Sequence, residues 1–248
     1  MLSMKSHLIA LLHSLVFFTR LPIPWTLPIL KRPSLILNYF SLMGLVLGLL
    51  LGALGHTIIP HFNFELVITL ILVLSLLLTG AFHEDGLADF FDALAARSRS
   101  HFLEISKDPR IGSYGVLALV GSFILKILLY REIGSENFIE TLILVYVLSR
   151  SLTCFLIYQN RNIAAVSKTG DLVNNFDFVG LLINLIPLIG VMLYFLTFSE
   201  MVMIVPSVLI LFVFRWKMKS MLGGITGDVI GAAQQIMELS LLLTLALI

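Results

Sequence analysis

Seven apolar stretches, most of them about 20 residues long, constrain the fold of this chain more than any other feature. They lie near residues 35–59, 64–82, 113–131, 138–159, 178–197, 199–214 and 229–248. A helix of about 20 predominantly apolar residues is what crosses the hydrocarbon core of a bilayer. The sequence therefore predicts an all-α, polytopic membrane bundle of about seven transmembrane helices.

The composition supports this class, because the chain has few charged residues with which to cover a water-facing surface. Hydrophobic residues make up 58% of the chain and charged residues 12%, whereas soluble domains average about 25% charged residues. A formal net charge of +1 excludes a polybasic nucleic-acid-binding protein, so no nucleic-acid partner is expected. The single cysteine, Cys154, excludes an intramolecular disulfide framework.

The N-terminal segment combines a short apolar stretch with a proline-broken one. Lys5 precedes apolar residues 8–18, and the stretch from Arg20 to Trp25 follows without a small-residue cleavage site. A signal peptide needs such a site, so the segment is expected to be retained as an amphipathic helix in the membrane interface. No separate soluble domain, repeat or linker is evident, and residues 1–248 are expected to form one integral-membrane domain.

Two features of the expected spans predict helix contacts. Gly44, Gly48 and Gly52 recur every four residues on one face of the first span, a stripe suited to close packing of two helices. Lys126 and Arg150 lie within spans, where a charge in hydrocarbon is costly, so both should face the bundle interior or a polar cavity.

Basic residues gather in alternate connecting segments. Segments 1–34, 83–112, 160–177 and 215–228 hold thirteen of the sixteen Lys and Arg residues, whereas 60–63, 132–137 and 198–200 hold none. Because Lys and Arg are enriched in cytoplasmic loops, the N-terminus and the four basic segments are expected in the cytoplasm, and the C-terminus outside.

The strongest polar cluster follows the second span, in residues 83–92. Asp85, Asp89 and Asp92 are spaced i, i+4 and i+7, so on a helix they share one face, where like charges repel. A divalent cation reverses that repulsion, and Mg²⁺ commonly binds through one or two carboxylates together with substrate phosphates. The sequence thus favours a metal site, although acids near a helix N-terminus are also favourable without one.

Two glycine-containing segments on the same expected side could bind an anion. In residues 108–115, turn glycines allow a ligand to approach backbone N–H groups, and Arg110 could hold a phosphate through two hydrogen bonds. The same glycine pattern would also be expected where a loop without a ligand simply leads into a membrane helix. In residues 223–228, three glycines and a threonine precede a helix and favour an anion cradle, although Asp228 could be only a helix cap.

Four segments together resemble the cobalamin synthase family, whose members are adenosylcobinamide-GDP ribazoletransferases. They are Phe18–Pro24, Gly80–Asp92, Asp108–Gly115 and Gly223–Ala232, in the family's order and spacing, and Lys126, Ser149 and Arg150 also fit. The resemblance covers essentially the whole chain. Ala93, where the family usually has glycine, and Pro109, where relatives often have serine, depart from the pattern.

The resemblance implies a membrane transferase that joins adenosylcobinamide-GDP to α-ribazole, or to its 5′-phosphate, and releases GMP, with Mg²⁺ as cofactor. The products are adenosylcobalamin or its 5′-phosphate. The implied location is a bacterial or archaeal cytoplasmic (inner) membrane, in contact with lipid, with the active-site loops in the cytoplasm. Transfer of a bulky intermediate between partner enzymes of nucleotide-loop assembly is a hypothesis for why the step is membrane-bound.

The motifs and the resemblance together assign the candidate site residues. The expected catalytic residues are Asp85, Asp89, Asp92 and Arg110, of which the three aspartates are also the expected metal ligands. The expected substrate-binding residues are His83, Glu84, Asp108, Arg150, Gly223, Gly224, Thr226, Gly227 and Asp228.

Two other classes of protein compete with this interpretation. A CDP-alcohol phosphotransferase-like enzyme also uses membrane aspartates and a divalent metal, but Asp89 follows Asp85-Gly86-Leu87-Ala88 out of that family's register. A cation transporter would carry its acids near mid-span, whereas these cluster at a helix end, and no inverted repeat is evident.

Overall fold

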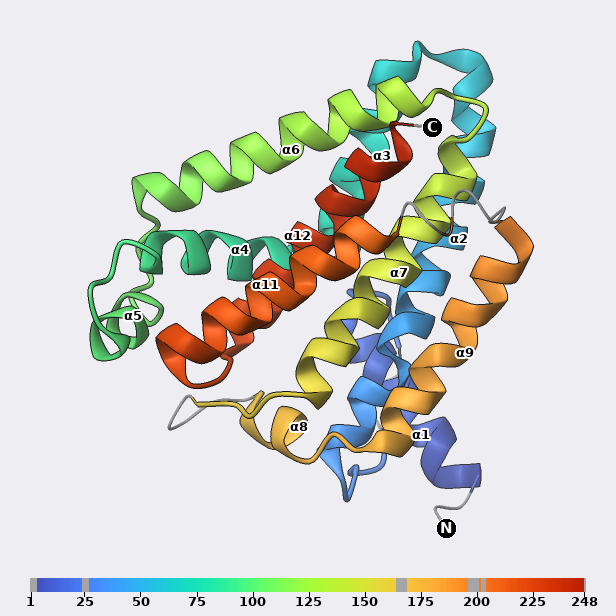
Figure 1. Cartoon of the computed structure of the whole chain (residues 1–248). Coiled ribbons are helices and arrows are strands. Elements are labelled where there is room, and N and C mark those ends of the chain that lie inside the picture. The colour runs from blue at the N-terminus through green and yellow to red at the C-terminus, as the bar shows by residue number, and fades with distance from the viewer. Residues whose placement is uncertain (1–3, 24–26, 164–168, 196–200, 202–203, 248) are drawn as a thin grey trace.

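The computed structural model describes residues 4–23, 27–163, 169–195, 201 and 204–247, and its regular structure there is helical (Figure 1). The α-helices are α1 (Met4–Phe18), α2 (Phe40–Ile58), α3 (Phe64–Thr79), α4 (Phe82–Ala93), α5 (Arg99–Ile105), α6 (Ser113–Ile133), α7 (Phe138–Tyr158), α8 (Gly170–Asn174), α9 (Phe178–Phe195), α11 (Val205–Leu222) and α12 (Gly227–Leu245). Two short 3₁₀ helices, η1 (Pro33–Tyr39) and η2 (Ile59–His61), flank α2.

The all-helical membrane class is confirmed, with five or six candidate spans among the described residues where the sequence suggested about seven. Five helical segments are long and apolar enough to cross a membrane, and the bent pair α3–α4 would make a sixth. The five are Pro33–His61, Ser113–Ile133, Phe138–Tyr158, Phe178–Phe195 and Gly227–Leu245.

The expected span at 199–214 differs most from the structure. The helix there, α11, runs from Val205 to Leu222 and carries Arg215, Lys217 and Lys219 in its second half. The predicted span ended at residue 214 because charged residues follow, whereas the helix continues through them to Leu222. The expected hairpin at 197–200 lies outside the described residues.

Helix α7 occupies the centre of the molecule and packs against α2, α9 and α12 (Figure 1). The glycine stripe of α2 faces α7, as predicted. A Cβ atom placed on Gly48 would lie 2.9 Å from the Cα of Ile143, and one on Gly44 would clash with the backbone carbonyl oxygen of Tyr146. Because such a separation is too short for a real Cβ, the α2–α7 contact requires glycine at both positions.

A sharp break separates α3 from α4. Gly80 and Ala81 both have positive φ, +67° and +53°, a left-handed conformation that ends a helix, and the two helix axes differ by 90°. The backbone N–H of Arg20 donates to the carbonyl of Leu78 at 2.6 Å, and the Arg20 guanidinium lies against Gly80. The segment after α1 therefore holds the bend from which α4 begins.

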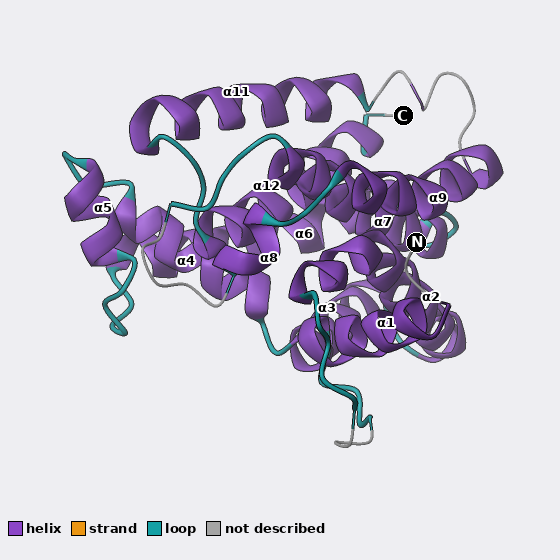
Figure 2. Cartoon of the chain, turned by 90° about the horizontal axis from the view of Figure 1, so that it is seen from below, coloured by secondary structure: helices purple, strands orange, loops and turns teal. Residues whose placement is uncertain are grey.

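The expected N-terminal helix is present as α1, which is 15 residues long and apolar. It packs against η1 and α2, and the buried hydroxyl of Ser14 donates to the carbonyl of Ile36 at 2.7 Å. Figure 2 shows α1 and α3 on the opposite side of the molecule from α11. Its placement in the membrane interface stays a prediction.

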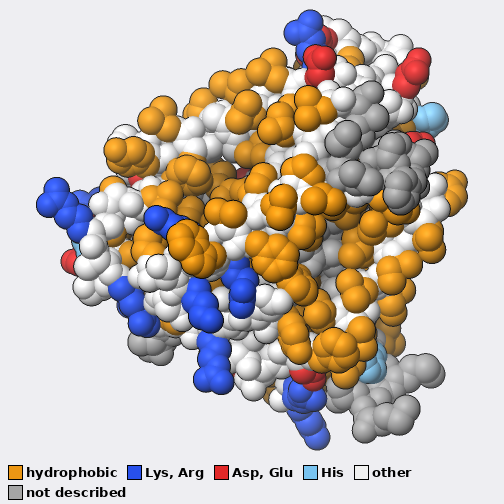
Figure 3. All heavy atoms as spheres, in the orientation of Figure 1, with side chains coloured by type: hydrophobic (Ala, Val, Ile, Leu, Met, Phe, Trp, Pro, Cys, Tyr) orange, Lys and Arg blue, Asp and Glu red, His pale blue; other side chains and the backbone are white. Residues whose placement is uncertain are grey.

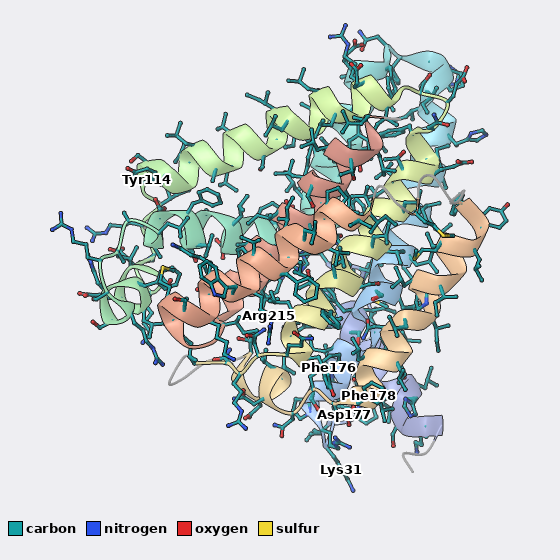
Figure 4. The ribbon with its side chains drawn as sticks, in the orientation of Figure 1. Lys31, Tyr114, Phe176, Asp177, Phe178 and Arg215 are labelled. Atoms are coloured by element: carbon teal, nitrogen blue, oxygen red, sulfur yellow. The ribbon has the colours of Figure 1, made fainter. Side chains whose placement is uncertain are left out.

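Ion pairs join segments that were expected at the same end of the bundle, and the side of the membrane that each end faces stays a prediction. At one end, Lys31 lies near Phe176, Asp177 and Phe178 (Figure 4), and Arg32 pairs with Asp177 at 3.4 Å. At the other end, Arg131 pairs with Glu65 at 3.1 Å. Apolar side chains cover most of the face in Figure 3, and Lys and Arg side chains gather toward its lower left edge.

Candidate active site

The candidate site forms where α4 crosses the start of α12. A Cβ placed on Gly86 would lie 3.1 Å from the Cα of Gly231 and 3.1 Å from the carbonyl oxygen of Asp228. A Cβ on Gly231 would lie 3.1 Å from the carbonyl oxygen of His83. Small residues on both helices allow the two backbones to approach this closely. The crossing brings the middle of α4 against the first turn of α12.

This crossing adds a carboxylate to the aspartate face of α4. Asp85 is exposed and Asp89 and Asp92 are half-buried on the face predicted from their spacing. Asp228, in the first turn of α12, is close enough to Asp85 and Asp89 that their charges repel it. The structure therefore brings together two of the predicted ligands and a residue that sequence spacing could not place beside them.

Asp92 has a different environment from the other two aspartates. It accepts hydrogen bonds from the backbone N–H of Gly112 at 2.7 Å and from that of Gly115 at 2.8 Å. These bonds satisfy unpaired N–H groups at the start of α6 and fasten the 108–115 segment to the end of α4. The glycine N–H groups predicted to contact a ligand thus bind Asp92, and its role as a third metal ligand stays a prediction.

The acids on α4 and α12 fit a magnesium ion that shares its coordination with substrate. The ion pairs among the described residues leave Asp85, Asp89 and Asp228 without a basic partner. No group of three or more His, Cys, Asp or Glu residues within the described ranges is arranged to hold a metal alone. Mg²⁺ keeps several waters and needs only one or two carboxylates when phosphates supply other oxygens, so the donor set suits that mode.

The 223–228 segment has structural roles at both ends. Gly223 has a φ of +80° and ends α11 in the left-handed conformation, and the hydroxyl of Thr226 caps α12 by accepting from the N–H of Val229 at 3.3 Å. Between them, Ile225 forms an isolated parallel bridge with Asn162. These roles account for Gly223 and Thr226 without a ligand, and anion binding by this segment stays a prediction.

Two basic side chains lie near the glycine segments in different ways. A Cβ on Gly223 would lie 3.6 Å from Nη1 of Arg99, so α5 places a guanidinium beside this turn, which the sequence did not indicate. Arg110 is 86% exposed and pairs with Asp108 at 2.7 Å. Hydrogen bonds from Arg110 lower the pKa of Asp108 to about 2. The structure thus joins Arg110 to Asp108 and turns both toward solvent.

His83 and Glu84 point away from the aspartate face. His83 is buried, and its ring stacks 6.3 Å from that of Phe18 and lies 5.5 Å from that of Phe40. Glu84 accepts a hydrogen bond at Oε1 from Gln235 of α12 at 3.1 Å. Both of these predicted substrate-binding residues therefore face the interior of the helix bundle rather than the aspartates.

A buried ionic network continues from Glu84, and its central acid was missed from the sequence. Glu238 of α12 pairs with Lys126 at 2.6 Å and with Arg150 at 3.3 Å, so both cations face the interior as predicted. Arg150 also donates to the carbonyl of Tyr146 at 3.0 Å. One signal in the sequence could have identified Glu238. Lys126 and Arg150 lie within spans and require an acidic partner, and Glu238 is an acid within another span. The network gives Arg150 internal partners rather than an exposed position.

Comparison with known proteins identifies the family. The model of the cobalamin-5-phosphate synthase family matches residues 10–246, which includes the four motif segments and Glu238. The chain belongs to the cobalamin-5-phosphate synthase family. Membership in that family confirms the resemblance seen in the sequence and makes the chain a membrane transferase of cobalamin biosynthesis.

Curated relatives of this cobalamin-5-phosphate synthase family member are similar over nearly their whole length. The adenosylcobinamide-GDP ribazoletransferase of Vibrio cholerae is 36% identical over 234 residues, covering 92% of this chain and 90% of that protein. Those of Shewanella amazonensis and Thermoanaerobacter pseudethanolicus are 34% and 32% identical, covering 100% and 92% of this chain and 98% and 92% of their own lengths. No solved structure matches the chain.

Proposed function

We propose that the chain transfers the adenosylcobinamide phosphate of adenosylcobinamide-GDP to α-ribazole or to α-ribazole 5′-phosphate. A ribose hydroxyl oxygen of the acceptor bonds to the cobinamide-side phosphorus, and the bond from that phosphorus to the bridging oxygen breaks. GMP leaves, and the hydroxyl proton is released. The product is adenosylcobalamin, or its 5′-phosphate when the acceptor is phosphorylated.

The single observation that carries this proposal is the convergence of acids at the α4–α12 crossing. Asp85 and Asp89 lie on one face of α4 beside Asp228 of α12, and none has a basic partner among the described ion pairs. An uncompensated group of carboxylates next to two glycine-containing segments suits a metal-assisted reaction of a diphosphate.

Asp85 and Asp89 would hold Mg²⁺, and Asp228 lies where it can contribute a further oxygen. When bound, the ion neutralises charge on the diphosphate and on the leaving phosphate. Asp92 acts on the site through the backbone, because it holds the start of α6 at 2.7 and 2.8 Å. Arg99, beside the Gly223 turn, and Arg110, in the segment that Asp92 anchors, supply cations for the diphosphate.

The proposal includes a membrane orientation. The chain is a multi-pass membrane protein, and its basic segments should lie on the cytoplasmic side of a bacterial inner membrane. The start of α12 and the 108–115 and 223–228 segments would then face the compartment that holds the nucleotide substrates. Residues 1–248 would act as one membrane domain, and delivery of substrate by other enzymes of nucleotide-loop assembly remains a hypothesis.

The test is release of GMP by the purified chain in detergent or liposomes. Adenosylcobinamide-GDP, α-ribazole and Mg²⁺ should give GMP and adenosylcobalamin in equal amounts, and omission of α-ribazole should abolish both products. Turnover of a CDP-alcohol with a second alcohol, or cation flux into the liposomes without GMP release, would instead support one of the rival classes.

A further inference from the structure

A cavity of about 380 Å³ lies next to the candidate site, on the other side of α4. Helices α4 and α6 meet near the start of α6 and diverge toward α3 and α12 (Figure 1), and the cavity lies in this wedge. Its volume is within the range of about 300–1,000 Å³ typical of small-molecule sites.

The walls of the cavity are apolar, and its rim belongs to an apolar surface. Leu72 and Leu76 of α3 and Phe123 of α6 line it. On the rim, Val120 and Ile124 of α6 are 51% and 50% exposed. Because α6 is a candidate membrane span, a ligand can enter from the hydrocarbon region without crossing a polar surface.

The inner part of the cavity is polar and includes one carboxyl oxygen that accepts no hydrogen bond from the described residues. Glu84, Lys126 and Gln235 line it, and Lys126 donates to Gln235 at 2.7 Å while Gln235 donates to Oε1 of Glu84 at 3.1 Å. The second oxygen, Oε2 of Glu84, is buried and has no hydrogen-bond partner among the described residues. A buried carboxyl oxygen without a partner is costly, so a ligand that donates a hydrogen bond to it would gain affinity.

We propose that this cavity binds the aromatic base of the nucleoside acceptor, with Oε2 of Glu84 accepting a hydrogen bond from the ribose of that nucleoside. A flat bicyclic base presents apolar faces to the walls formed by Leu72, Leu76 and Phe123. A ribose hydroxyl supplies the hydrogen-bond donor that a carboxylate oxygen needs. A lipid acyl chain would fill the walls but leave Oε2 of Glu84 without a partner. The inference rests on the proposed function.

The position of Glu84 in the chain connects this cavity to the aspartates. Glu84 and Asp85 are neighbours on α4, with Cα atoms about 3.8 Å apart and side chains about 100° apart around the helix. A nucleoside whose ribose donates to Glu84 therefore has that ribose next to the Asp85 side, where the diphosphate would be held.

Two substitutions and two matched controls test the assignment. Val120→Trp should fill the mouth of the cavity, whereas Val116→Trp, one turn earlier on α6 and 44% exposed, lies outside it. Glu84→Leu should remove the hydrogen-bond acceptor, and Glu104→Leu removes an exposed acid on α5. Each purified variant is measured for α-ribazole binding by equilibrium dialysis, without corrinoid, and for the KM of each substrate.

Val120→Trp and Glu84→Leu should weaken α-ribazole binding and raise its KM by about tenfold or more, with the KM for adenosylcobinamide-GDP close to that of the wild type. Both controls should behave as the wild type. Normal α-ribazole binding and KM in folded Val120→Trp would overturn the assignment. A variant that changed only the amount of lipid that co-purifies with the protein would also overturn it. A wild-type chain that releases no GMP would contradict the proposed function instead, and dialysis would still report on the cavity.

Discussion

Gly86 of α4 and Gly231 of α12 touch through their backbones, and a Cβ atom on either would lie 3.1 Å from the Cα of the other. Neither glycine needs a positive φ, since both lie within helices, so the requirement is space rather than backbone freedom. The contact sets the distance between Asp228 and the aspartates of α4, and the candidate site therefore depends on two residues that carry no side chain.

Gly86→Ala should lower both stability and activity. The added methyl meets backbone atoms of α12, and overpacking of this kind costs about 1–3 kcal/mol of unfolding free energy. Thermal unfolding in detergent and GMP release would be measured together. The control is Gly121→Ala, since a Cβ on Gly121 of α6 meets nothing within 4 Å. Equal activity in the two variants would show that the close crossing is unnecessary.

Asp92→Ala should destabilise the chain while Asp85→Ala should not. Asp92 caps the start of α6 through Gly112 and Gly115, and the loss of a helix cap costs about 0.5–2 kcal/mol. Asp85 is exposed and makes no described ion pair. Hydrogen exchange of the Gly112 and Gly115 amides should increase in Asp92→Ala alone. Unchanged exchange would mean that other contacts hold the segment.

Glu238→Gln should be the most destabilising of these substitutions. Lys126 and Arg150 both pair with Glu238, and removing one partner of a buried pair costs about 3–5 kcal/mol because the remaining charge is uncompensated. The comparison is Glu140→Gln, which changes an exposed acid in the first turn of α7. Similar melting temperatures for these two variants would contradict a structural role for the network.

The sequence allowed several parts of this arrangement to be predicted, because local spacing determines them. The glycine stripe of α2 and the shared face of Asp85 and Asp89 follow from the helical repeat. The 90° break between α3 and α4 could not be predicted, since Gly80 is followed by Ala81, which has a positive φ that non-glycine residues seldom adopt. That conformation is held by tertiary contacts of the segment around Arg20.

Pairings between distant segments were the part that the sequence could not supply. Lys126 and Arg150 were expected to face the interior, but their common partner lies 112 and 88 residues further along the chain. The same applies to Asp92, whose spacing suggested a metal ligand and whose partners are backbone N–H groups at the start of α6. Spacing along a helix identifies a shared face but not what approaches it.

Cysteine labelling tests the orientation. Ser98 and Ser135 are both exposed, and they belong to segments expected on opposite sides of the membrane. In intact cells, Ser98→Cys should resist an impermeant thiol reagent and Ser135→Cys should react, because segments rich in Lys and Arg stay in the cytoplasm. Cys154 is buried, so labelling of the unsubstituted chain gives the background signal. The reverse labelling pattern would place the aspartates on the outer side.

The most direct test of the metal-assisted mechanism measures GMP release and thermal stability of Asp85→Asn and Asp89→Asn at limiting Mg²⁺. Each substitution removes a repelling charge and a hard anionic ligand, so both variants should insert normally and melt no lower than the wild type without Mg²⁺. Added Mg²⁺ should raise the melting temperature of the wild type, since a ligand that binds only the folded state stabilises it, and should raise that of the variants much less. The account predicts that both variants lose most of their transferase activity; wild-type turnover in both at limiting Mg²⁺ would contradict it.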